Sequence, residues 1–271
     1  MKFWSMQKVK WQSALEWIAP VLLGLLGLSA WEIGVRVTHT PVYLLPGPIL
    51  IGQTLLKDWG ILLPALLTTI KITLCAFTAA TVSGVFISIL MAQSKWIEKS
   101  LYPYVIVLQT TPLAAIAPLI IIWLRNNSFL ALVVCAWIAA LFPIISNTTF
   151  GLSSADPALR DLFQLYQASR WQTMRYLRLP SALPYFLNGL RISGGLSLIG
   201  AIIAEFVAGS GGSNSGIAYQ ILMAGYNLEI PRMFAALILI TTLGILIFIT
   251  LEICSNALLK DWHESSIRRD R

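Results

Sequence analysis

The sequence predicts an all-α, polytopic membrane protein with about six transmembrane helices, and three observations support this fold class. Of the 271 residues, 57% are hydrophobic and only 11% are charged, whereas a soluble domain usually carries about 25% charged residues. Six apolar segments are each long enough to cross a bilayer, which takes about 20 residues in a helix. The basic residues are concentrated in alternate connections between these segments, as in membrane proteins with a fixed orientation.

The predicted spans follow one another along most of the chain. In chain order they cover residues 15–36, 62–92, 100–124, 128–150, 183–208 and 232–258. We therefore expect a cytoplasmic N-terminal segment, a transmembrane domain with one long cytoplasmic loop, and a cytoplasmic tail. These parts would cover residues 1–14, 15–258 (loop 151–182) and 259–271.

The first apolar segment also has features of a signal peptide. Lys2, Lys8 and Lys10 precede it, and residues 28–30 form a weak cleavage site. Apolar residues continue to Val37, which favours a retained transmembrane helix over a cleaved signal peptide.

The distribution of Lys and Arg predicts the orientation. With the N-terminus in the cytoplasm, 13 of the 19 basic residues lie on the cytoplasmic side, 4 lie outside or at the outer rim, and 2 lie within helices. Positive charge is enriched in cytoplasmic loops, so we expect both termini inside. The net charge of +7 is then a consequence of topology and not a sign of nucleic-acid binding.

Two outer loops are expected to contain further structure. Loop 37–61 should begin extended around Pro46 and Pro48 before a second apolar run. Loop 209–231 begins with several glycines and continues with an apolar segment. We interpret this segment as a short re-entrant or interfacial helix that ends before Pro231.

The cytoplasmic loop 151–182 is the first place to look for function, because long ordered loops usually bind something. Ser154 or Asp156 can cap a first helix, and Ser169 can cap a second helix that Pro180 is expected to end. Apolar residues recur at helical spacing in both helices, and arginines flank them. Such a loop could lie on anionic lipid or fit a groove on a cytoplasmic partner.

The loop also resembles a signature of the membrane subunits of ATP-driven (ABC) importers, which reads E-A-A, three residues, G, nine residues, I-x-L-P. The acid, the spacing and the Leu-Pro ending are present, whereas both alanines and the glycine are replaced. Residues 167–172, QASRWQ, are similar to the G-A-S-R-W-Q turn of one branch of these permeases. The residues that the resemblance places in an ATPase-coupling loop are Asp161, Gln167, Ala168, Ser169, Arg170, Leu177, Leu179 and Pro180.

Motifs outside the loop extend the resemblance over about residues 45–255, to the nitrate, sulfonate, taurine and thiamine-precursor branch. They are LPGP at 45–48, PLAAIAPL at 112–119, LPSALPY at 179–185, GLR at 189–191 and AEF at 204–206. The resemblance implies a type I ABC importer permease (MetI-like) architecture in the plasma membrane of a prokaryote. It implies pairing with an identical or similar permease, cytoplasmic ATP-binding subunits and an extracytoplasmic solute-binding protein. It implies no cofactor or metal in this chain, because the partner subunit uses the ATP.

Gln167 stands where the signature has glycine. Glycine tolerates a left-handed turn, which another residue adopts at a cost of roughly 1–2 kcal/mol. We therefore expect the turn to be right-handed here, or the loop to bend one residue later.

Four polar residues within apolar segments are candidates for the solute path or a gate: Gln109, Thr110, Asn147 and Glu205. Each could instead bond to a neighbouring helix, the commoner role of such residues in membranes. Lys71 is a possible partner for Glu205 across the bundle. The cysteines Cys75, Cys135 and Cys254 match no metal-binding or redox spacing, and we expect them to be buried.

Two other functional classes have less support in the sequence. A self-contained secondary transporter usually shows internal repeats and charged residues near the middle of the bilayer, and a membrane-embedded enzyme should show paired acids or a histidine cluster. The sequence contains no convincing repeat or cluster of this kind. The solute stays open among nitrate, an organic anion and a vitamin precursor.

Overall fold

The computed structural model describes residues 2–209 and 215–260, with side chains from residue 19 onward. The described residues form helices and connections without strands, which confirms the all-α prediction. In chain order the helices are α1 (Lys2–Val37), α2 (Pro48–Lys57), α3 (Trp59–Gln93), α4 (Lys95–Thr110), α5 (Leu113–Trp123), α6 (Ser128–Ser153), α7 (Pro157–Leu165), α8 (Arg170–Thr173), a π-helical segment η1 (Met174–Arg178), α9 (Leu179–Ala208), α10 (Ile217–Tyr226) and α11 (Ile230–Leu259). The predicted tail lies outside the described residues from 261 onward, as do Gly211 and Gly212.

Membrane-length helices match the predicted spans at five of six positions. Within the described chain, five helical stretches are long and apolar enough to cross a bilayer, and the pair α4–α5 makes a sixth if it is one bent span. The third predicted span is therefore wrong as a continuous helix, because α4 and α5 meet at 98°. Pro112 has no N–H to donate and disfavours a helical conformation at the residue before it. Thr111 is accordingly extended, with φ −71° and ψ 123°.

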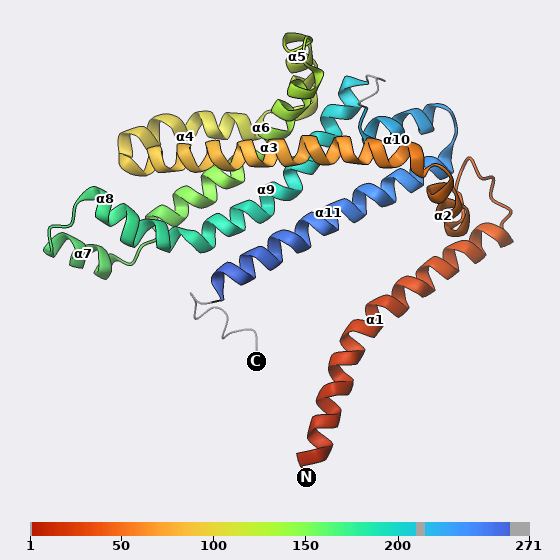
Figure 1. The fold of residues 1–271 in the computed structure, drawn as a ribbon, viewed down its shortest axis with the longest axis horizontal. Helices are drawn as coiled ribbons and strands as arrows, with labels where there is room; N and C mark the ends of the chain where they lie inside the picture. The colour runs from red at the N-terminus through yellow and green to blue at the C-terminus, as the bar shows by residue number, and fades with distance from the viewer. Residues whose placement is uncertain (1, 210–214, 261–271) are drawn as a thin grey trace.

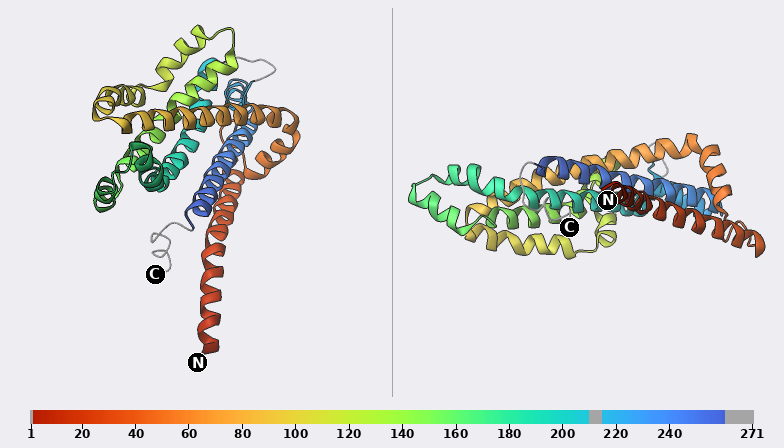
Figure 2. Two further views of the ribbon diagram at one scale, coloured as in Figure 1. Left: turned by 60° about the vertical axis from the view of Figure 1, so that its left-hand side comes forward. Right: turned by 90° about the horizontal axis from the view of Figure 1, so that it is seen from below.

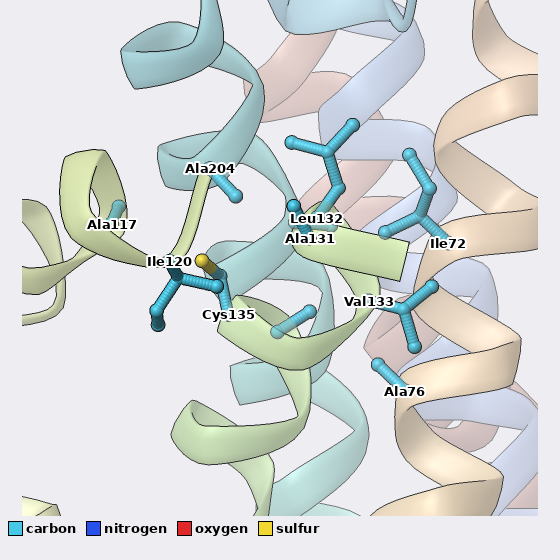
Figure 3. Packing of buried hydrophobic residues seen from close by; sticks show 11 residues of the cluster. Ile72, Ala76, Ala117, Ile120, Ala131, Leu132, Val133, Cys135 and Ala204 are labelled. Carbon is cyan, nitrogen blue, oxygen red and sulfur yellow. The ribbon is translucent and has the colours of Figure 1, made fainter. Parts of the chain in front are cut away.

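Helix α6 lies at the centre of the bundle, where it packs mainly against α9 and α3 (Figure 1). The buried faces of α3 and α9 consist largely of small residues, which lets helix backbones approach closely, as is common between membrane helices. Figure 3 shows the largest buried cluster, in which Cys135 and Ala131 of α6 meet Ile72 and Ala76 of α3 and Ala204 of α9. The same cluster includes Ile120 of α5.

Side-chain hydrogen bonds between helices add to this packing. Ser193 of α9 donates to the carbonyl of Ala140 at 2.6 Å. Ser88 of α3 donates to the carbonyl of Ile145 at 3.1 Å. Buried hydroxyl groups in membrane helices are expected to find such partners, so these bonds hold α3 and α9 in register with α6.

The two ends of the bundle carry different short helices. Helices α7 and α8 lie at one end, here called the loop end, and α2 and α10 lie at the opposite end, here called the far end (Figure 1). Helix α1 reaches the far end, where Trp31 contacts Phe234 with ring centroids 5.9 Å apart. The remainder of α1 extends away from the other helices (Figures 1 and 2). The predicted short helix in loop 209–231 is confirmed as α10.

The three cysteines show that an apolar sequence does not distinguish a side chain buried in the bundle from one on its surface. Cys135 is buried in the core of α6, whereas Cys75 and Cys254 are exposed. The prediction of three buried thiols is thus wrong for two of them. An apolar stretch of a membrane helix faces lipid as well as protein, so it does not identify the buried face.

We predict that Gly200→Ala destabilises the bundle by about 1–3 kcal/mol, because the added methyl group overpacks the core. A Cβ at this position of α9 would lie 2.8 Å from the Cα of Ala136 in α6, so the two backbones must separate. Gly195→Ala on the same helix is the matched control, since its Cβ would meet nothing within 4 Å. Thermal unfolding in detergent measures both variants, and equal melting temperatures would contradict the close contact.

Candidate functional site

The loop between α6 and α9 is a compact helical unit. Asp156 accepts a hydrogen bond from the Ala158 N–H at 2.8 Å and caps α7, in which Pro157 occupies the first turn. Of the two predicted caps, Asp156 is therefore the one used, as expected for a side chain that satisfies a free first-turn N–H. Arg160 then donates to the carbonyls of Ala155 at 3.1 Å and of Ser153, the last residue of α6, at 3.5 Å, which holds α7 against the end of α6.

The turn after α7 is left-handed at Gln167, with φ +51°, so both predicted alternatives are wrong. The reason is the pair of hydrogen bonds that end the helix. Gln167 N–H donates to the Gln164 carbonyl at 2.9 Å, and Ala168 N–H donates to the Phe163 carbonyl at 2.9 Å. This is the Schellman pattern, which satisfies carbonyls at a helix end and requires a left-handed residue. The two bonds offset the cost of placing glutamine there.

The second loop helix begins with the predicted cap. Ser169 accepts from the Gln172 N–H at 3.2 Å, and the Gln172 side chain accepts from the Ser169 N–H at 2.7 Å, which forms a capping box. The predicted end of this helix at Pro180 is wrong, because the chain continues through η1 directly into α9. In η1 the hydrogen bonds span five residues, as in the bond from Leu179 N–H to the Met174 carbonyl. This local widening accommodates a proline that cannot donate a helical bond.

Two contacts fasten the loop to the membrane helices. Arg178 donates to the carbonyl of Ala92 near the end of α3 at 3.0 Å. Leu177, which occupies the isoleucine position of the signature, is only 5% exposed. Both residues therefore attach the loop to the bundle, and they leave the rest of the signature to face outward.

The outward face of the loop is apolar and hollow. A depression of about 360 Å³ is lined by six residues, here called the loop patch: Leu162, Phe163, Tyr166, Ala168, Gln172 and Tyr176. Tyr166 is 78% exposed and Tyr176 is 65% exposed. Asp161 and Arg170 are also exposed beside the patch. Exposed aromatic residues with a charged border are typical of a protein interaction site.

A second candidate site lies at the break between α4 and α5. Gln109 and Thr110 line an open cavity of about 400 Å³ between α4, α5, α6 and α9. Thr110 and Thr111 direct their hydroxyl groups to carbonyls of their own helix, at 3.0 and 2.6 Å. The remaining lining residues are apolar, apart from Gly200 and the prolines. The structure thus brings together two of the four candidate path residues.

The other two candidates lie elsewhere, and each has partners. Asn147 donates to the Pro143 carbonyl at 2.8 Å and accepts from Asn188 at 3.0 Å. Glu205 is 3% exposed and accepts from the Thr69 hydroxyl at 2.7 Å. The proposed pairing with Lys71 is therefore wrong: the side chain of Lys71 is exposed, and its neighbour Thr69 contacts the acid instead.

Sequence reasoning missed several residues that position these sites. Arg178 gives no signal in the sequence beyond its positive charge, although it holds the loop to α3. Arg232 and Asp58, from segments far apart in the chain, form an ion pair at 2.6 Å at the far end. Neither contact has a local signal, because both depend on how distant helices pack. The proline at 112, in contrast, was a visible signal for the break in the third span.

These features together define a class of protein. Membrane-length helices, a bent helix pair beside a cavity and a protruding amphipathic loop characterise a multi-pass membrane protein of the transporter class. Comparison with known proteins then specifies the family. The family model of the binding-protein-dependent transport system inner membrane component matches residues 84–260, so the chain belongs to this family.

The relatives and the solved structures agree with this assignment. The formylaminopyrimidine transport permease protein ThiX of Halalkalibacterium halodurans is 32% identical over 89% of this chain and 95% of its own length. The riboflavin transport system permease protein RibX of Chloroflexus aurantiacus is 30% identical over 95% of this chain and 96% of its own length. Sulfonate and nitrate permeases also match. The inward-facing MetNI methionine ABC transporter has the same fold, with a TM-score of 0.63 at 16% identity over 74% of this chain and 97% of the matched chain.

The chain is accordingly an inner membrane permease component of an ABC importer, within the nitrate, sulfonate and thiamine-precursor branch.

We predict that Gln167→Gly stabilises the loop by about 1 kcal/mol, because glycine adopts φ +51° without steric cost. The amide protons of residues 167 and 168 should then exchange about fivefold more slowly with solvent. The matched control is Gln164→Gly, which places glycine within α7. This variant should destabilise the loop, by about 0.5–1 kcal/mol. Hydrogen–deuterium exchange of the purified chain measures both, and faster exchange in Gln167→Gly would contradict the strained turn.

Proposed function

We propose that this chain forms one half of the translocation path of an ABC importer and pairs with a second copy or a similar permease. In this arrangement the loop end faces the cytoplasm and seats in a separate ATPase subunit. The far end faces an external protein that delivers the solute. The observation that carries the proposal is the loop patch, an exposed apolar surface on a loop that joins α6 to α9 and bonds to α3 through Arg178.

The geometry of the loop supports coupling to a partner. Its exposed aromatics lie on a unit whose turns are fixed by a cap, a Schellman turn and a capping box. A partner that moves this unit must therefore move α6 and α9 with it, because the loop joins them directly. ATP hydrolysis would take place in the partner, and this chain would contribute no catalytic residue.

The charges support the proposed orientation. The loop end holds the basic residues Lys95, Lys99, Arg160, Arg170, Arg175 and Arg178, whereas the far end holds Arg36, Lys57 and Arg232. An excess of positive charge on one side is typical of the cytoplasmic side. With an even number of crossings, both chain termini would lie inside.

The exposed apolar surface of α1 supports pairing with another subunit. No residue in the apolar stretch of its span Ala19–Val37 is buried within this chain. Lipid covers part of such a surface, and a second permease beside the bundle would cover the rest.

The cavity at the helix break is the proposed part of the solute path. Among the residues that the structure describes, its lining contains the amide of Gln109 and no charged side chain, which suits an uncharged polar solute better than nitrate or a sulfonate. The vitamin-related solutes in the names of ThiX and RibX point the same way. We therefore propose a heterocyclic vitamin or vitamin precursor as the solute class.

The first test concerns the ATPase. A tagged chain extracted in mild detergent should retain an ATPase subunit, and Asp161→Lys should lower transport about tenfold or more, since reversing an interface charge creates repulsion. Folded protein in the membrane should not decrease. Glu98→Lys reverses another exposed acid, on α4 near the loop end, and should transport normally. The importer reading fails if no ATPase copurifies and transport persists after ATP depletion.

The second test concerns the path. In a cysteine-free variant, Thr110→Cys should react with a water-soluble thiol reagent, and the reaction should block transport. Thr242→Cys is the matched control, because Thr242 also bonds to its own helix but does not line the cavity. In the assembled importer, formylaminopyrimidine or riboflavin should slow the reaction, whereas nitrate should not. Protection by nitrate alone would contradict the proposed solute class, and equal reactivity of both cysteines would contradict the path.

A further inference from the structure

The buried end of α10 is held by residues from two other helices. Ala218 N–H donates to Oε2 of Glu205 at 2.9 Å, and Ile217 N–H donates to the hydroxyl of Thr69 at 2.9 Å. The same hydroxyl donates to Oε1 of Glu205 at 2.7 Å. Glu205 belongs to α9 and Thr69 to α3. Three helices therefore meet in one closed set of hydrogen bonds.

This set of bonds replaces the cap that α10 lacks. The residue before α10 is Gly216, which has no side chain to accept a hydrogen bond. The first N–H groups of a helix need partners, and their partial positive charge attracts an anion. Glu205 and Thr69 satisfy two of these groups from outside the helix. Glu205 is 3% exposed and Thr69 is fully buried, so water does not compete for these bonds.

Gly216 has a second role, which is to leave room. A Cβ at this position would overlap the carboxyl group of Glu205. The glycine therefore allows the acid to approach the start of α10 closely enough to bond with Ala218. A side chain at position 216 would therefore clash with the carboxylate of Glu205. The clash depends on the carboxylate, so the contact can be tested by combining substitutions at the two positions.

The position of Glu205 in α9 connects the two ends of the molecule. Helix α9 begins at Leu179, where the loop ends, and continues for 30 residues to Ala208, a length of about 45 Å. Glu205 is one turn from its far end. After α10 the chain enters α11, where Arg232 pairs with Asp58, between α2 and α3, and with Glu229, just before α11. Among the described residues, the side-chain hydrogen bonds that other helices make to α10 itself are at its first turn, and the one that comes from α9 is made by the carboxylate of Glu205.

We propose that Glu205 is a positioning residue that makes α10 move together with α9 and α3, so that displacement of the loop end reaches the far end of the path. This proposal rests on the proposed function, because it concerns how that importer couples its two ends. The acid does not contact the solute in this role, which distinguishes it from the path residues at the break of the third span.

The first experiment uses the purified chain in detergent and does not depend on any partner. Gly216→Ala should lower the melting temperature of the wild-type protein but have no further effect in a Glu205→Ala background, because the overlap is then absent. Thr69→Val should also lower it. Thr68→Val is the matched control, since the hydroxyl of Thr68 bonds only to the Pro64 carbonyl of its own helix. Additive effects of Gly216→Ala and Glu205→Ala would overturn the proposed contact.

The second experiment uses the importer assembled with its ATPase and binding protein in vesicles, and it measures solute molecules transported per ATP hydrolysed. Loss of a positioning contact should lower this ratio about fivefold or more in Thr69→Val and Glu205→Ala. Glu205→Gln, which keeps one acceptor oxygen, should restore part of the ratio, and Thr68→Val should leave it unchanged. A merely structural role would lower the amount of active importer and leave the ratio intact, which would overturn the positioning role. If no ATPase associates with the chain, the proposed function fails, whereas the first experiment still tests the contact.

Discussion

The close contact between α6 and α9 is the interaction on which the other features depend. Backbones approach at Gly200 and Ala136, and the hydroxyl of Ser193 bonds across to Ala140. Hydrophobic attraction between helices is weak in lipid, so close van der Waals packing and such bonds must supply most of the association energy. Both helices continue into the loop at one end, and α9 carries Glu205 at the other. A change in this contact would therefore displace the loop, the cavity wall and α10 together.

The sequence predicted the parts of the fold that local physics determines. Apolar length located five continuous spans, and the caps at Asp156 and Ser169 were visible as side chains able to satisfy free N–H groups. The handedness at Gln167 was not predictable in this way, because the bonds that stabilise it close only when Phe163 and Ala168 come together. The partner of Glu205 was predicted as Lys71 on charge alone. The structure instead satisfies the carboxylate with a hydroxyl and a helix N-terminus, which lie close only after packing.

The turn at Gln167 has a counterpart at the far end. Leu228, between α10 and α11, is also left-handed, with φ +58°. Leu228 N–H donates to Gly225 at 3.2 Å, and the next residue donates to Ala224 at 2.8 Å, in the same Schellman pattern. In both places a short helix must end and the chain must enter a long one. The hydrogen bonds that end the first helix outweigh the steric cost of a non-glycine residue there.

Three of the four polar candidates for the solute path form hydrogen bonds within the protein. Inside a bilayer an unpaired polar group is costly, so most of them find a partner within the protein. Asn147 bonds to Pro143 and Asn188, and both oxygens of Glu205 are bonded. Thr110 is bonded to its own helix. The amide of Gln109 differs from these, since it lies exposed at the cavity without such a bond in the described chain. A helix break exposes such a group beside a space that a solute can enter. In the proposed solute path, Gln109 is therefore the polar side chain that the described residues leave free to contact a solute, whereas the hydrogen-bonded residues support the surrounding structure.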